Sequence, residues 1–186
     1  IVSEINAVGG MAVGLSGKDA GLITARKLRR TISDPDSNIE KILDLGFVGE
    51  PVEINPDVLH VFEESDVIPV IAPMGMDNKG QVYNINADTA AGTIANQIKA
   101  ERLLLMTDVP GVNDKSGNLI SQLSTKQALD LIDDGTITGG MIPKIKTCIS
   151  AIESGVNGVV IIDGRKSHAV LFELFSNLGA GTLIVK

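Results

Sequence analysis

The chain has 186 residues, 44% of them hydrophobic, which is enough to bury a sizeable core in one domain, or in one domain and part of another. Sixteen Lys and Arg against 23 Asp and Glu give a formal net charge of -7, which opposes the phosphate neutralisation that duplex nucleic-acid binding requires. With no Trp, one Tyr and four Phe, the chain also has few side chains to stack on bases, so nucleic acid is not an expected partner.

Apolar runs and cysteine content set further limits. The longest apolar runs, 67–74 and 103–106, are far shorter than the roughly 20 residues of a membrane-spanning helix, so no membrane span is expected. The single cysteine, Cys148, excludes an internal disulfide. It is compatible with a reducing cytoplasm, which is the predicted location.

The first ten residues, IVSEINAVGG, predict the end of a helix. Ile1, Ile5 and Val8 share one helical face, and the pair Gly9 and Gly10 can stop the helix. The segment has neither the basic start nor the apolar centre of a signal peptide. The chain is therefore expected to begin partway through an element of a longer protein.

Two short strands, 12–15 and 22–25, are predicted next, and the turn-rich segment SGKDAG between them predicts a hairpin. Residues 26–41 are polar and charged, and 34–38 are their most loop-like part. They predict a surface excursion with little functional weight. The nearby stretch 31–45 is the best place for a subdomain division.

From residue 47 onwards, predicted strands and helices alternate. The strands are 47–54, 67–72, 81–83, 102–107, 159–162 and 183–185, and the second of these is expected to be buried. The helices are 56–64, 87–98, 124–134, 141–154 and 168–175. This order predicts an α/β sandwich with a mainly parallel central sheet, in which ligands collect beyond the strand ends.

The segment NINAD, residues 84–88, lies between a predicted strand and the start of a helix. Polar side chains there can face a cleft, and the helix dipole favours anions. Asn86 or Asp88 can equally serve as a helix cap, because Asn and Asp are preferred at that position. On the residues alone, both interpretations stay open.

Two further segments have the features of phosphate or nucleotide contacts. The strand 103–106 runs into TDVPGV, where Gly111 permits close backbone approach; the alternative is a simple turn in which Asp108 bonds its own backbone. In GGMIPK, two glycines precede a helix that carries Lys144, which can neutralise a transferring phosphoryl group. A solvated surface lysine is the alternative there.

Several common motifs are absent. GLSGKD has neither the glycine spacing nor the Ser or Thr after the lysine that a Walker loop needs. Neither a GxGxxG motif nor a zinc pattern occurs, and His60 and His168 lie far apart without cysteine partners. No protein metal site is therefore expected.

The informative segments occur together and in order: AVGLSGKDAGLI, GFVGE, YNINADTAAG, LLLMTDVPGV, GGMIPKIK and IIDGRKSHAVLFELFSNLGAGTLI. This combination, over nearly the whole chain, closely resembles the N-acetylglutamate kinases of the amino-acid kinase family. The resemblance implies a three-layer α/β/α sandwich whose N-terminal lobe binds N-acetyl-L-glutamate and whose C-terminal lobe binds ATP with Mg²⁺. The first lobe would be incomplete and reach to about residue 60, and the second would span about 61–186.

The resemblance also implies roles for individual residues. Asn84 would contact the substrate, Asp88 would orient two catalytic lysines, and Lys144 would stabilise the transferring phosphoryl group. The ATP site would be lined by Thr107, Asp108, Val109, Gly111, Val112, Asn113, Thr136, Ile137 and Thr138. The implied reaction is ATP-dependent phosphorylation of the side-chain carboxylate of N-acetyl-L-glutamate, in L-arginine biosynthesis.

The ending GAGT resembles the arginine-inhibited members of the family, in which Glu173 and Gly179 would contact L-arginine. A solvent-facing glutamate and a turn glycine are the alternative interpretations. The resemblance further implies a homo-oligomer for the full-length enzyme.

The family's lysine-and-glycine loop, its GGG turn and its substrate-binding arginine all precede the region that matches Ile1. This chain alone is therefore expected to have little kinase activity. The alternatives are a non-catalytic fragment that binds nucleotide or arginine, and another member of the amino-acid kinase family.

Overall fold

The computed structural model describes residues 1–33, 40–176 and 179–186, and the chain forms two compact units, Ile1–Ala90 and Ala91–Lys186. Helix α3 (Ala87–Gln97) begins in the first unit and ends in the second. The predicted lobe boundary near residue 60 and the predicted division at 31–45 both precede this point. Which lobe binds which ligand stays a prediction. Within the described residues, no helix is long and apolar enough to cross a bilayer.

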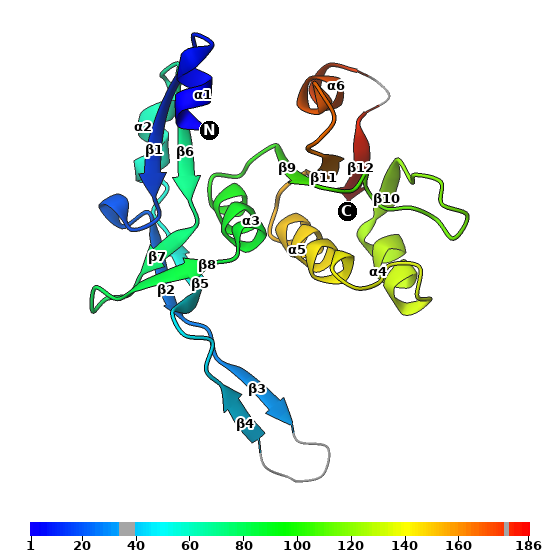
Figure 1. The fold of residues 1–186 in the computed structure, drawn as a ribbon, viewed down its shortest axis with the longest axis horizontal. Helices are drawn as coiled ribbons and strands as arrows, with labels where there is room; N and C mark the ends of the chain where they lie inside the picture. Colours follow the sequence, from blue (N-terminus) through cyan, green and yellow to red (C-terminus); the bar gives the residue numbers. More distant parts are fainter. Residues whose placement is uncertain (34–39, 177–178) are drawn as a thin grey trace. The chain divides into compact units, whose positions relative to one another are not determined.

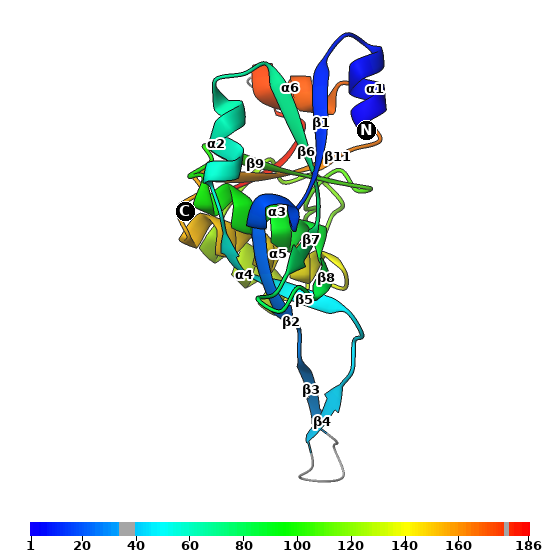
Figure 2. The same cartoon turned by 90° about the vertical axis from the view of Figure 1, so that its left-hand side faces the viewer.

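In the first unit, strands β1 (Met11–Ser16) and β6 (Val67–Ala72) form a two-stranded parallel sheet, with Met11 opposite Val67. Helix α1 (Val2–Ala7) contacts β1, and α2 (Asp57–Glu63) contacts β6 (Figures 1 and 2). The side chain of Asn55 accepts a hydrogen bond from the Asp57 N–H at 3.2 Å, as expected at the start of this helix.

Four more strands of the first unit close into a small barrel in the order β2 (Ile23–Lys27), β5 (Val48–Ile54), β8 (Val82–Ile85) and β7 (Met74–Met76). Side chains two residues apart on one strand point to the same face. Ile23 and Ala25 of β2, and Tyr83 and Ile85 of β8, are accordingly buried. These predicted strands are therefore confirmed in place and type.

The predicted hairpin between the first two strands is wrong, because β1 pairs with β6 whereas β2 pairs with β5 and β7. The loop that connects β1 to β2 forms its hydrogen bonds with other groups. The Gly17 N–H donates to the Ala72 carbonyl at the end of β6, and the Ser16 N–H donates to the Asp19 carboxylate. Turn-forming residues therefore identified a loop but not the partner of either strand.

The predicted excursion at 26–41 contains parts of two short strands that were not predicted. Strands β3 (Arg30–Ser33) and β4 (Glu40–Leu43) pair antiparallel, with Arg30 opposite Leu43 (Figure 1). Residues 34–38, the expected loop centre, lie outside the described residues. Strand β6 was expected to be buried, yet its residues are half-buried and Ile68 is 49% exposed. Within the described residues it has only β1 as a sheet neighbour.

The second unit is built on a four-stranded sheet with the order β10 (Gln122–Ser124), β12 (Gly181–Val185), β11 (Gly158–Asp163) and β9 (Arg102–Thr107). The β10–β12 and β9–β11 pairs are parallel, and the β11–β12 pair is antiparallel. All six residues of β11 are buried, as expected of a strand covered on both faces.

Alternate residues of this sheet belong to two apolar clusters. Leu103, Leu105, Val159 and Ile161 pack in one cluster with residues of α3, α4 (Thr125–Asp133) and α5 (Met141–Glu153). Val160 and Ile162 pack in the other, with Ala169 of α6 (Ala169–Phe175). Figures 1 and 2 show α4 and α5 on one face and α6 on the opposite face. The second unit thus has the predicted three layers, and the α/β class is confirmed.

Candidate functional site

A cavity of about 270 Å³ lies in the second unit, between the loop that follows β9 and the segment that joins α4 to α5. Its lining residues are Val109, Pro110, Gly111, Val112, Asn113, Asp114, Thr136, Ile137, Thr138 and Met141. Seven of the nine residues predicted to bind ATP are among them. Two segments separated by more than twenty residues in the sequence are therefore brought together around one space.

The first wall of the cavity, residues 109–114, is fixed by a buried hydroxyl. Thr182 of β12 is fully buried, and its Oγ1 accepts a hydrogen bond from the Val112 N–H at 2.8 Å. The same Oγ1 donates to the Ile120 carbonyl at 2.7 Å. Gly111 has φ +145, and a Cβ there would lie 2.5 Å from this hydroxyl. Only glycine fits that approach without a shift of the backbone.

The second wall, residues 134–138, begins at the C-terminus of α4. Gly135 has φ +76 and turns the chain, as glycine commonly does after a helix. Ile137 is 2% exposed and belongs to the main apolar cluster, which anchors this wall to the core. The flanking Thr136 and Thr138 bring hydroxyl groups to the cavity. A ligand here would therefore meet both apolar and hydrogen-bonding surface.

The carboxylate of Asp134 bonds the second wall and Lys115, the residue that follows the first wall. It accepts hydrogen bonds from the Thr136 hydroxyl and from the Thr136 N–H at 2.9 Å, and it forms an ion pair of 3.1 Å with Lys115. These bonds, that of the Thr136 side chain first, lower the pKa of Asp134 from 3.8 to about 2. Asp134 therefore stays ionised throughout the physiological range.

Helix α5 begins next to the cavity. Gly139 has φ +56 and Gly140 is the N-cap, and no side chain caps the helix. Met141, the first helical residue, lines the cavity, whereas the half-buried Lys144, one turn further on, does not. The Met141 and Ile142 N–H groups donate to the Thr138 and Gly139 carbonyls, both at 3.2 Å, and Pro143 has no N–H, so any preference for an anion at this end comes from the helix dipole.

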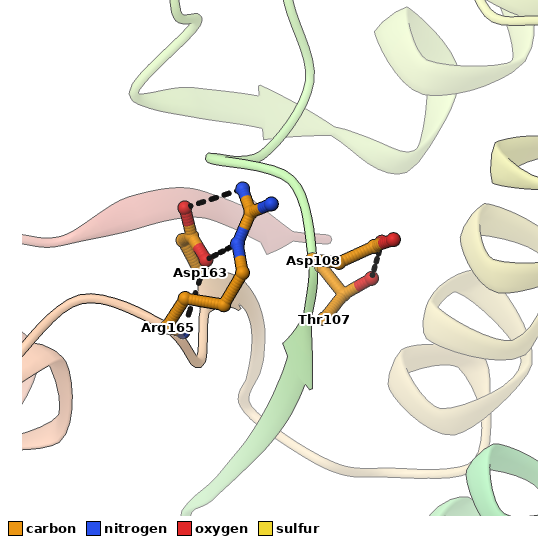
Figure 3. A network of polar contacts seen from close by, with 4 residues as sticks. All are labelled: Thr107, Asp108, Asp163 and Arg165. Carbon is orange, nitrogen blue, oxygen red and sulfur yellow. Dashed lines mark hydrogen bonds and ion pairs between the residues drawn. The ribbon is translucent and has the colours of Figure 1, made fainter.

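Thr107 and Asp108, also predicted to bind ATP, lie at the carboxyl end of β9 (Figure 3). They are not among the residues that line the cavity. The Thr107 hydroxyl donates to the Asp108 carboxylate at 3.3 Å. Among the described residues Asp108 accepts no backbone hydrogen bond, so the alternative of a turn closed by Asp108 is wrong.

On the neighbouring strand, Asp163 lies opposite Thr107 and binds Arg165 through both carboxylate oxygens, at 2.9 and 3.0 Å (Figure 3). Bonds from the Arg165 side chain and backbone lower the pKa of Asp163 from 3.8 to about 2. The Gly164 N–H donates to the Thr107 carbonyl at 2.8 Å. This turn therefore fixes the end of β9, from which the first wall continues.

The NINAD segment lies at the end of β8 and the start of α3. The Asn86 side chain accepts hydrogen bonds from the Thr89 N–H at 3.1 Å and the Thr89 hydroxyl at 3.3 Å, so Asn86 caps the helix. Asn84 is exposed, and Asp88 is half-buried in the first helical turn. Their roles in substrate binding and lysine orientation stay predictions.

Glu173, one of the two predicted effector residues, is only 7% exposed, so the alternative of a solvent-facing glutamate is wrong. Its carboxylate accepts hydrogen bonds from the Ala180 N–H at 2.9 Å and from Arg102 at 3.3 Å. Gly179 has φ +66, which is typical of a turn glycine. The contact of both residues with arginine stays a prediction.

Sequence reasoning missed several residues that shape the site. Thr182 appeared only within an ending motif, and Lys115, Asp134 and Arg165 were not singled out. No local pattern identifies Thr182, whose partners are 62 and 70 residues away. The acidic run Asp133-Asp134 before Gly135 is a usable signal, because acidic side chains are unfavourable at a helix C-terminus. Within the described ranges, no group of three or more His, Cys, Asp or Glu could hold a metal ion.

Comparison with known proteins gives a consistent family. Residues 1–163 match the family model of the amino acid kinase family. The chain is 60% identical over 186 residues to the acetylglutamate kinase of Parvibaculum lavamentivorans, and 62% identical over 184 residues to that of Rhodospirillum rubrum. The two alignments include 100% and 99% of this chain, and 61% and 59% of the two relatives, respectively. The chain thus spans about three fifths of their length.

Among solved structures, the chain is similar to the N-acetylglutamate synthase from Neisseria gonorrhoeae complexed with coenzyme A and L-arginine. The TM-score is 0.76 at 26% identity, and the match covers 95% of this chain and 38% of that one.

Proposed function

This chain belongs to the amino acid kinase family, and from that premise we propose that the whole protein transfers the γ-phosphoryl group of MgATP to the side-chain carboxylate of N-acetyl-L-glutamate. The product is N-acetyl-L-glutamyl 5-phosphate, an intermediate of L-arginine biosynthesis. The observation that carries the proposal is the cavity of the second unit, where two segments expected to bind ATP meet. Identity of 60% to acetylglutamate kinases over the whole chain supports this substrate.

In this proposal the cavity holds the nucleoside of ATP. Ile137 and Met141 supply apolar surface for the base, and Thr136, Thr138 and Asn113 supply hydrogen-bonding groups. Thr107 and Asp108, at the carboxyl end of β9, face the remainder of the nucleotide, in the region of a parallel sheet where ligands collect. Mg²⁺ belongs to the substrate, since the ion is usually bound through nucleotide phosphates in kinases.

The proposed chemistry needs no general base, because a carboxylate is already ionised near neutral pH. A carboxylate oxygen of the substrate forms a bond to the γ-phosphorus, the bond from that phosphorus to the β-γ bridging oxygen breaks, and ADP leaves. The two anions must be held in line while their charge is neutralised. We assign Lys144, near the N-terminus of α5, to the transferring phosphoryl group, Asp88 to lysine orientation and Asn84 to the substrate.

Coupled ADP release by the whole protein tests this function. We expect turnover with N-acetyl-L-glutamate and little with L-glutamate, L-aspartate, carbamate or UMP, which other members of the fold would use. Lys144→Ala should lose transition-state stabilisation on the order of 3 kcal/mol, or more than about a hundredfold in kcat/KM.

Lys146→Ala is the matched control, since Lys146 is an exposed lysine on the same helix, and its turnover should stay unchanged. Nucleotide binding without turnover would instead favour a non-catalytic binding protein. Preference for another acceptor would overturn the assignment of N-acetylglutamate.

We further propose that L-arginine binds near Glu173 and Gly179 and inhibits the enzyme. The similar synthase from Neisseria gonorrhoeae is complexed with L-arginine, and Glu173 is a buried carboxylate that already binds one guanidinium group, that of Arg102. Titration calorimetry with L-arginine on the whole protein tests this. Absence of binding, or equal binding after Glu173→Gln, would contradict it.

The proposed function also implies a cellular location and an oligomeric state. It places the enzyme in the cytoplasm, because a single cysteine, Cys148, cannot form an internal disulfide and is compatible with a reducing compartment. It also expects a homo-oligomer, which light scattering on the whole protein would detect as a mass above that of one chain.

A further inference from the structure

Asp134 contacts Thr136 of the second wall and Lys115, the residue that follows the first wall. Its carboxylate accepts hydrogen bonds from the N–H, at 2.9 Å, and the hydroxyl of Thr136, which lines the second wall. Lys115, directly after the lining residue Asp114 of the first wall, approaches the same carboxylate at 3.1 Å. One side chain therefore links, at the surface, two loops whose buried members Val112 and Ile137 belong to the same apolar cluster.

The loop that contains the first wall continues into a turn at residues 114–118, which is held by its own hydrogen bonds. The Asp114 carboxylate accepts hydrogen bonds from the Ser116 and Asn118 N–H groups, both at 2.8 Å. The Asp114 N–H donates to the Asn118 carbonyl at 2.8 Å, which closes a tight turn around Lys115. The lysine thus extends from a turn with its own hydrogen bonds, so its pairing with Asp134 acts on the whole loop.

The helix dipole does not favour Asp134, although the Asx turn that its carboxylate forms with the Thr136 N–H is one local reason for Asp at this position. Asp134 is the C-cap of α4, so its carboxylate lies at the negative end of the helix dipole. The last turn of α4 carries no basic residue to offset this charge. The other end of α4 follows the rules, since Ser124 and Gln127 form a capping box. Departures from local preference in an otherwise consistent sequence are expected mainly at functional sites.

Folding stability does not explain the ion pair either. The Lys115 and Asp134 side chains are 67% and 46% exposed, and exposed ion pairs contribute little to stability. Lys115 follows the lining residue Asp114 and Asp134 bonds the lining residue Thr136, which distinguishes this pair from the other exposed pairs given by the described residues.

We propose that Asp134 is a positioning residue for nucleotide binding, which holds the two cavity walls at a fixed separation by binding Lys115 and Thr136 together. This inference rests on the proposed function of the cavity. Asp134 touches neither the nucleotide nor the phosphoryl group. It keeps the walls in the arrangement that fits the nucleoside, so that less ordering is required on binding.

The test compares Asp134→Asn, Lys115→Met and Lys115→Arg in the whole protein. Asp134→Asn keeps an oxygen for Thr136 but loses the charge that attracts Lys115. Both Asp134→Asn and Lys115→Met should raise the KM and Kd for MgATP by about fivefold, with kcat within about twofold of wild type. Lys115→Arg should restore wild-type values, because it keeps the charge. The double variant should be no weaker than Asp134→Asn alone.

Lys126→Met is the control, because Lys126 is an exposed lysine of α4 without an ion pair to the described residues. Hydrogen exchange without nucleotide gives a second readout. Amides in 109–115 and 134–138 should exchange faster in Lys115→Met than in Lys126→Met. Lys115 is exposed, so its variant stays informative if Asp134→Asn fails to fold.

The outcomes separate the two proposals. If wild-type protein binds no nucleotide, the proposed function fails. If it binds nucleotide and both charge-removing variants bind equally well, or lose kcat with unchanged KM, the positioning role of Asp134 is overturned while the proposed function stands.

Discussion

The hydroxyl of Thr182 lies where three chain segments meet, β12, the first cavity wall and the start of the segment leading to β10. Removing it leaves the Val112 N–H and the Ile120 carbonyl without their buried partner. An unsatisfied buried polar group typically lowers stability by about 1–3 kcal/mol. We therefore predict that Thr182→Val, which preserves the shape, lowers the free energy of unfolding in urea by about that amount and weakens nucleotide binding.

Thr182→Ser is the matched control, because it keeps the hydroxyl and loses only a methyl group. It should retain most of the hydrogen bonding and most of the nucleotide affinity. If the valine variant is as stable as the serine variant, the hydroxyl does not anchor the wall.

A second residue-scale prediction concerns Asp163, whose pKa Arg165 lowers to about 2. A folded-state pKa below the unfolded value of about 3.9 adds stability that is present above pH 3.9 and is lost as the pH falls towards 2. Arg165→Met should therefore move the pKa of Asp163 up towards 3.9. The stability difference between wild type and variant should shrink as the pH falls from 6 to 3. Carboxyl-resolved NMR titration and urea unfolding at both pH values measure these effects.

Lys166→Met provides the comparison for Asp163. Lys166 is near the same carboxylate but contributes less to its low pKa than the hydrogen bonds of Arg165. The titration of Asp163 should therefore change less in this variant. An equal change in both variants would mean that net charge, rather than the two-point bond, sets the pKa.

At the scale of single elements, α4 is the helix whose beginning is best defined. The Ser124 hydroxyl accepts from the Gln127 N–H at 3.1 Å, and the Gln127 side chain accepts from the Ser124 N–H at 2.8 Å. Replacement of such an N-cap residue by alanine typically lowers stability by about 1 kcal/mol. We predict this loss for Ser124→Ala by urea unfolding. Ser121→Ala, an exposed serine before the helix, should have no effect.

Element type and position were largely predictable, because they depend on local periodicity. The strand at Leu103 and Leu105 and the helix after Ser124 were located within one or two residues. Pairing was less predictable, because it depends on residues far apart in the chain. The loop after Ser16 looked like a hairpin turn, yet β1 pairs with β6, more than fifty residues later. For the same reason a solvent-facing Glu173 stayed open as an alternative, although Arg102 and the Ala180 N–H donate to its buried carboxylate.

At the scale of the whole molecule, the two units differ in their sheets: the second has one four-stranded sheet with apolar clusters on both faces, whereas the first has a two-stranded sheet and a small barrel. The second unit has one main cluster with fully buried members from its sheet and helices. In the first unit, Met11 and Ile68 of the two-stranded sheet are 54% and 49% exposed. We predict that residues 87–186, expressed alone, unfold cooperatively and give dispersed amide NMR signals, whereas residues 1–86 alone do not.

Circular dichroism and NMR are the suitable methods, since the single Tyr of the chain, Tyr83, lies outside residues 87–186 and there is no Trp. Poorly dispersed signals from residues 87–186 would show that this unit depends on the rest of the protein.

The candidate site was predictable only as separate segments. TDVPGV and the threonines after Gly135 could be identified from the sequence, but their meeting around one cavity depends on the order of β9, β11 and β12. The connections that set its shape, from Thr182 and Asp134, join residues whose types are common on any surface. The sequence therefore identified most residues that line the cavity but not Thr182 and Asp134, which bond to them.

The position of β12 has a consequence for protein synthesis. This strand, which ends at Val185, lies inside the sheet between β10 and β11, so before it has left the ribosome β10 lacks its sheet partner and β11 can pair only with β9. Until then the edges of β10 and β11 are open to wrong partners, and the Thr182 hydroxyl that shapes the cavity is missing. Assembly of the second unit must therefore wait for residues translated some eighty positions after β9.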